Sequence, residues 1–114
     1  MAKDDYFVIV AKILVYLYAK LKGKNKVPAV EYIHPLSKDF PISEDYLNMI
    51  IDEMADHGYI KINRFKAWGG EVVLRDIDSI RITQEGIEYL RDNSTMKKIA
   101  DTIPMAASIY ELFQ

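Results

Sequence analysis

The pattern of apolar positions changes along the chain, and it first predicts a helix over about residues 4–22. Asp4 and Asp5 would lie in its first turn and Lys20 and Lys22 in its last, which complements the helix dipole. The middle of this segment is apolar on nearly every side, so the helix must be covered on more than one face. One small domain offers limited cover, so we expect self-association, as a homodimer. The contact is predicted to involve this helix and the C-terminal segment, through Ile9, Ile13, Tyr16, Ile109, Leu112 and Phe113.

A second helix is predicted over about residues 44–57, where the apolar residues form a single stripe. Ser43 is a favourable N-cap, and Gly58 suits the left-handed residue that follows the end of a helix. The stripe consists of Leu47, Ile50, Ile51 and Met54.

A β-hairpin is predicted directly after this helix. Strand-like alternation extends over about residues 59–75, and Gly69-Gly70 within it is typical of a two-residue hairpin turn. Residues 80–82 are expected to form a separate short extended piece. The segment between them, with its aspartates, is interpreted as a turn.

Two helical segments are predicted to follow the hairpin. Thr83 is expected to cap a helix over about residues 84–93, and Ser94 or Thr95 to cap a last helical segment over about residues 95–113. An amphipathic helix followed by a hairpin is the order in which a winged-helix protein presents its recognition helix and its wing. We therefore predict an α+β fold: a single winged helix-turn-helix-like domain, residues 1–114, with a hairpin wing and a C-terminal helical extension.

Two motifs add a resemblance to this order of elements. The stretch "MADHGYIKI" resembles the end of a recognition helix leading into a wing, and "IRITQEGIEYLRDNS" resembles the I-T-x-x-G-x-x-x-L start of the next helix in many winged-helix proteins. With its length and helical tail, the chain resembles the YjcQ family of bacterial and prophage proteins. The resemblance implies a winged-helix-like fold and lends a fold-level expectation of DNA binding, while the family has no settled activity.

Charge and composition narrow the possible functions. The formal net charge is −2 and the isoelectric point is about 5.6, which counts mildly against a protein that binds a phosphate backbone. The chain has no cysteine, which excludes disulfides and thiolate metal sites and fits a reducing cytosol. Its acidic start is unlike a signal peptide, and its apolar run is shorter than the roughly 20 residues that span a bilayer. We expect a cytoplasmic protein that makes no membrane contact.

The second helix is unusually acidic for a DNA-reading helix. Between Ser43 and His57 it carries five acids and no Lys or Arg, so phosphates would be repelled at short range. Its outward face is either a solvated surface or a docking face for a basic protein partner. That face contains Asp45, Asn48, Asp52 and Asp56.

The hairpin has the opposite character. With Gly69-Gly70 as the turn, Arg64 lies opposite Arg75, and an anion between them would relieve their repulsion. One face of the hairpin becomes apolar, and the other combines cations with the chain's single tryptophan, a combination that suits nucleic-acid backbones and bases. The nucleic-acid site predicted on this face consists of Arg64, Lys66, Trp68 and Arg75. A charge-protected edge hairpin is the alternative interpretation.

No catalytic constellation is present in the sequence. His34 and His57 lie far apart without metal-ligand spacing, and no phosphate-binding loop or nucleophile with its base occurs. We expect no enzyme, no metal and no cofactor. The predicted function is a non-enzymatic winged-helix module that binds nucleic acid through its wing, and the alternative is a protein-interaction module that uses the same fold as a scaffold.

Overall fold

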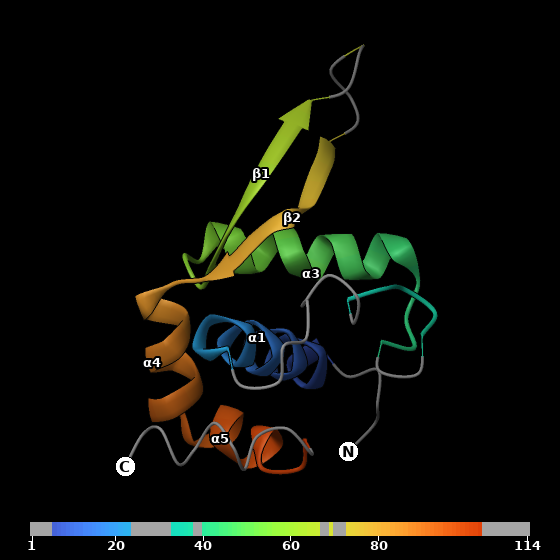
Figure 1. The fold of residues 1–114 in the computed structure, drawn as a ribbon. Coiled ribbons are helices and arrows are strands. Elements are labelled where there is room, and N and C mark those ends of the chain that lie inside the picture. The colour runs from blue at the N-terminus through green and yellow to red at the C-terminus, as the bar shows by residue number, and fades with distance from the viewer. Residues whose placement is uncertain (1–5, 24–32, 38–39, 67–68, 70–72, 104–114) are drawn as a thin grey trace.

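The structure is a computed structural model that describes residues 6–23, 33–37, 40–66, 69 and 73–103, and every structural statement below concerns these residues. Helix α1 (Tyr6–Lys22) lies at the centre, with α3 (Glu44–Asp56) on one side (Figure 1). Helices α4 (Gln84–Asp92) and α5 (Ser94–Ala100) cover its other side.

An antiparallel hairpin of β1 (Ile60–Lys66) and β2 (Val73–Ile82) lies beyond α3 and projects away from the helices (Figure 1). The fold is therefore α+β, as predicted, and its helix–hairpin–helix order is compatible with a winged-helix-like arrangement.

Helix α1 forms the centre of the hydrophobic core. Ten of its residues are buried, and it contacts α3, α4, α5 and β2. Ile9, Ile13 and Tyr16, which were predicted to form a contact between two chains, are covered within one chain. The other three residues of that predicted contact, Ile109, Leu112 and Phe113, lie outside the described residues. Self-association stays a prediction, but the all-round apolar helix no longer requires it.

Both ends of α3 follow the predicted capping residues. The Ser43 hydroxyl accepts a hydrogen bond from the Tyr46 N–H at 3.2 Å. Gly58 has φ +83°, in the left-handed region where a side chain would be strained, and the following Tyr59 N–H donates to the Met54 carbonyl. This C-terminal turn directs the chain into β1 and so determines where the hairpin leaves α3.

The hairpin register agrees with the predicted pairs. Arg64 lies opposite Arg75, and the neighbouring pairs are Phe65 with Leu74 and Lys66 with Val73. The predicted turn at Gly69-Gly70 is only partly described, since Gly70 lies outside the described residues.

The second strand is longer than predicted. The sequence suggested a strand that ends near Arg75, a turn, and a separate extended piece at residues 80–82, but β2 continues from Val73 to Ile82. A bulge absorbs the extra residues, because the register shifts between Lys61 and Asn63 on β1. The Ser79 hydroxyl fills the gap by accepting from the Asn63 N–H at 2.8 Å.

Helix α4 begins in very close contact with the end of α3. The Thr83 hydroxyl accepts from the Gly86 N–H and donates to the Gly58 carbonyl, so one side chain joins the two segments. A Cβ at Gly86 would overlap the Tyr59 carbonyl oxygen and lie 2.9 Å from a side-chain carbon of Ile82. The I-T-x-x-G-x-x-x-L motif therefore describes packing in this protein.

Helix α5 differs slightly from the expectation at its start. Asn93, and not Ser94 or Thr95, is the N-cap, and its side chain accepts from the Met96 N–H at 2.9 Å. Asn93 also terminates α4, so the two helices meet at a single residue. Over the described parts of the chain, no helix has both the length and the apolar character needed to cross a bilayer.

Candidate functional site

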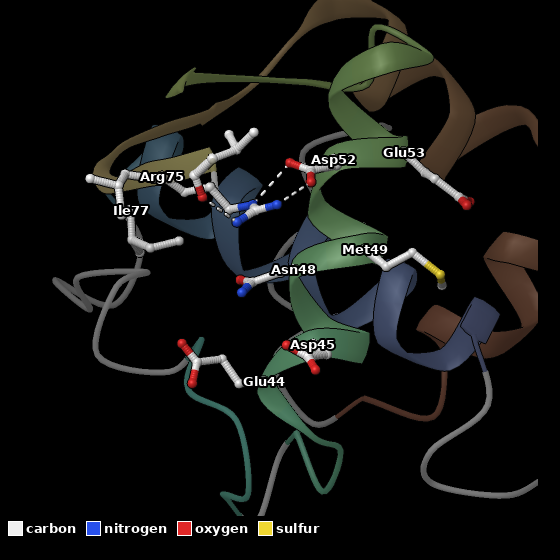
Figure 2. A pocket seen from close by; sticks show the side chains of 10 residues that line it. Glu44, Asp45, Asn48, Met49, Asp52, Glu53, Arg75 and Ile77 are labelled. Atoms are coloured by element: carbon white, nitrogen blue, oxygen red, sulfur yellow. Dashed lines mark hydrogen bonds and ion pairs between the residues drawn. The ribbon is translucent and has the colours of Figure 1, made fainter. Parts of the chain in front are cut away.

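An open groove lies between α3 and the start of β2, where the acidic face of the helix meets the wing. Its volume is about 820 Å³. Figure 2 shows Arg75 directed from the strand toward Asp52, with Asn48, Asp45 and Glu44 following along the helix. The groove is lined by Glu44, Asp45, Asn48, Met49, Asp52, Glu53, Val73, Leu74, Arg75 and Ile77.

An ion pair between Arg75 and Asp52 joins the two sides of the groove. The Arg75 Nε donates to Asp52 Oδ1 at 2.9 Å, and its second terminal nitrogen donates to Oδ2, so the pair is bidentate. The remaining terminal nitrogen donates to the Val73 carbonyl at 2.9 Å. Only 16% of the Arg75 side chain and 27% of the Asp52 side chain are exposed. Such a forked, partly desolvated pair is stronger than an ordinary surface ion pair.

Arg64 contacts the same acidic cluster from the other strand. One of its terminal nitrogens lies 3.5 Å from Asp52 Oδ1, and the other lies 3.3 Å from Asp56 Oδ1. Asp52 is therefore the anion that the opposed Arg64 and Arg75 were predicted to need. The repulsion within this cross-strand pair is compensated inside the molecule.

The arginines change the acidity of Asp52. Hydrogen bonding from Arg75 is the main cause that lowers the pKa of the Asp52 carboxyl below its usual value, and the charges of Arg75 and Arg64 act in the same direction. Partial burial opposes this shift but does not reverse it. Asp52 is therefore ionised at neutral pH and holds the wing against α3.

The structure brings together two sets of residues that the sequence suggested as alternatives. Arg64 and Arg75 from the predicted nucleic-acid site contact Asp52 and Asp56 from the predicted protein-interaction face. Of the other two wing residues, Lys66 is exposed at the end of β1, and Trp68 lies outside the described residues.

The other two residues of the acidic face, Asp45 and Asn48, line the open part of the groove. On the same side of α3, Asn48 lies one helical turn before Asp52 and Asp45 lies two turns before it.

The groove also has apolar surface, which the sequence did not reveal as part of a site. Met49 is 42% exposed, and Val73, Leu74 and Ile77 contribute from β2. Only the extension of β2 past Arg75 brings Ile77 to this surface. The exposed Met49 was a usable signal, because it interrupts an otherwise polar outward face of the helix.

The hairpin also exposes apolar and basic residues that form none of these ion pairs. Phe65 and Leu74 lie opposite each other and are 56% and 55% exposed. Nearer the helices, Lys61 lies opposite Arg81. Neither of these two cations forms an ion pair with any described residue.

A comparison with protein families gives a match that covers most of the chain. The family described as YjcQ protein matches residues 11–107. The chain belongs to the YjcQ family. Comparison with curated proteins and with solved structures gave no match. In this YjcQ family member, the matched region includes most of α1 and all of α3, the hairpin, α4 and α5, and so includes both sides of the groove.

Proposed function

We propose that this YjcQ family member is a non-enzymatic protein-interaction module, in which the winged-helix-like fold is a scaffold and the groove between α3 and the wing receives a partner. The observation that carries the proposal is the position of Asp52 against both Arg64 and Arg75. Asp52 occupies two of the wing cations, Arg64 and Arg75, and each phosphate contact requires an available cation.

The chemistry of the groove indicates the kind of partner. Glu44, Asp45 and Glu53 form no ion pair with any residue in the described ranges, so the open part of the groove keeps its negative charge. Met49 and Ile77 supply apolar surface next to these acids. A segment with alternating basic and apolar side chains would complement both features.

A peptide titration tests this proposal. The probe is a fluorescein-labelled synthetic peptide with alternating Lys and Leu, and the variants are Glu44→Gln/Asp45→Asn in the groove and Glu85→Gln/Glu88→Gln on α4. Both double variants remove two negative charges. We expect the groove variant to weaken peptide binding about tenfold and the α4 variant to leave it within about twofold, because only the first removes charge next to the peptide. Equal effects of the two variants would refute the groove as the binding site.

A second candidate function, nucleic-acid binding through the exposed cations near the base of the hairpin, is favoured by one observation. Lys61 and Arg81 lie opposite each other without an ion pair to any residue that the structure describes. Duplex DNA added in place of the peptide separates the two functions. Binding through phosphates would weaken steeply with salt and would be insensitive to the groove variant.

A further inference from the structure

On the other side of Glu53 from the groove, aromatic side chains surround a second and smaller pocket. Its volume is about 250 Å³, and buried Val10 and Met54 form part of its wall. The remaining lining consists of Tyr6, Phe7, Glu53, His57, Tyr59 and Tyr89. We propose that this pocket binds an alkylammonium cation, such as a quaternary amine or the methylated ammonium group of a lysine side chain.

The rings come from three segments of the chain. Tyr59 and Tyr89 are stacked with centroids 4.3 Å apart and planes 4° apart, and His57 lies 5.8 Å from Tyr59 at 30°. Tyr6 and Phe7, at the start of α1, meet edge to face with centroids 5.2 Å apart. Aromatic rings attract cations through the negative charge density of their faces, and aromatic walls around a small pocket recognise quaternary ammonium groups. Tyr59 and Tyr89 cover the faces that they turn toward each other, so a cation would meet the ring faces outside this stack.

The charge of the pocket selects a cation over a neutral ligand. Glu53 Oε2 accepts a hydrogen bond from the Tyr6 hydroxyl at 2.7 Å. Its Oε1 accepts none from any residue in the described part of the chain, so a negative charge remains available to a ligand. Burial and the neighbouring Glu53 raise the pKa of Tyr6, and burial raises the pKa of Tyr89. Both phenols therefore stay neutral, and Glu53 supplies the single negative charge that a monocation matches.

The size and the donor set of the pocket indicate the class of cation. One carboxylate and one imidazole among otherwise aromatic and apolar walls make a poor metal site, because metals require several oxygen, nitrogen or sulfur ligands. The pocket is slightly smaller than those that hold drug-sized ligands, which suits a compact head group. Methyl groups around the nitrogen would contact the rings, while the charge would lie close to Glu53.

An NMR titration with choline tests the proposal, with 3,3-dimethylbutan-1-ol as the neutral molecule of the same shape. We expect saturable shifts of the Tyr6, Tyr59 and Tyr89 ring signals with choline, and affinity at least about tenfold weaker for the neutral alcohol. Equal affinity for the two molecules would show a merely apolar pocket and would overturn the proposal. Absence of saturable shifts with choline would overturn it as well.

Three variants test which residues contribute to choline binding. Glu53→Gln removes the charge but keeps an oxygen that can accept from the Tyr6 hydroxyl, and we expect it to weaken choline binding about tenfold. Tyr89→Leu should weaken it comparably by removing a ring, while Glu85→Gln on the same helix should leave it unchanged. Retention of choline affinity in both Glu53→Gln and Tyr89→Leu would refute the site even if one of them folded poorly.

Two peptides identify the source of the cation. One carries a single trimethyllysine and the other an unmodified lysine at the same position. Tighter binding of the trimethylated peptide than of choline would assign the pocket to a protein side chain, and the reverse order would assign it to a small amine. The inference does not rest on the proposed function, because Glu44→Gln/Asp45→Asn changes the groove and leaves the lining of this pocket intact.

Discussion

The two halves of the hairpin are attached to the helices by different forces. At its base, Ile60 lies opposite Ile82, and both are buried in the core that α1 forms. In its distal half, Phe65 is exposed, and ion pairs from Arg64 and Arg75 to α3 hold the strands in place. Apolar packing is insensitive to pH and salt over the ranges in which ion pairs are lost. The base should therefore behave as part of the core, and the distal half as an element whose position depends on conditions.

The largest effect is expected from Gly86→Ala, at the base of the hairpin. The new Cβ would overlap the Tyr59 carbonyl oxygen, which is backbone and cannot move aside independently. We expect this overlap to lower the free energy of unfolding by about 3 kcal/mol. The better helix propensity of alanine offsets at most about 1 kcal/mol, so the net loss should be about 2 kcal/mol. Urea denaturation measures this loss. The control Glu88→Ala on the exposed side of α4 should change the free energy by less than about 0.5 kcal/mol.

The second largest effect is expected from Asp52→Asn, which acts on the distal half of the hairpin. This change removes the charge that compensates Arg64 and Arg75, and we expect a loss of about 1.5 kcal/mol in unfolding free energy, between the values for surface and buried pairs. Asp56→Asn is the matched control, because among the described residues Asp56 forms an ion pair with Arg64 alone and its side chain is 68% exposed. It should lose less than about 0.5 kcal/mol. Equal losses in the two variants would show that Asp52 has no special role.

Acid is expected to have a smaller effect, confined to the distal half of the hairpin. The pKa of Asp52 is lowered in the folded protein, so its stabilising contribution is complete above the ordinary aspartate pKa of about 3.9 and is lost as the pH falls through the folded value. Amide hydrogen exchange should show faster opening of the distal half in this acid range, after correction for intrinsic rates, while Ile60 and Ile82 stay protected. Asp52→Asn should abolish this pH dependence. Opening of both halves together would mean that the hairpin is one cooperative unit.

Sequence alone predicted the helix ends around the hairpin better than the site between α3 and the wing. Ser43, Gly58 and Thr83 act through neighbours in the chain, so capping rules located the helix ends correctly. The contact of Asp52 with Arg75 spans 23 positions and depends on how the hairpin folds back over α3. Charge counting therefore predicted two separate surfaces where the fold forms one neutralised contact.

Local sequence rules did not predict the bulge or the aromatic pocket, for the same reason. The extra residues of β2 are accommodated by a side chain of that strand, Ser79, which bonds across to the partner strand. The pocket joins the start of α1 to the ends of α3 and α4, three segments whose proximity no local pattern records. What could be found in advance was the opposed pair Arg64 and Arg75, because a hairpin turn fixes its own register.

The smallest expected effect concerns the cations of the hairpin and any weak binding of duplex DNA. All three nitrogens of the Arg75 guanidinium donate within the molecule, whereas Arg81 has no ion pair to any described residue. If DNA binding is detectable at low salt, Arg81→Gln should reduce the slope of log affinity against log salt by about one unit, and Arg75→Gln should leave the slope unchanged. Fluorescence anisotropy of a labelled duplex over a salt series measures both slopes. The opposite result would mean that Arg75 leaves Asp52 when a phosphate approaches, and that the contact between α3 and the wing opens to bind nucleic acid.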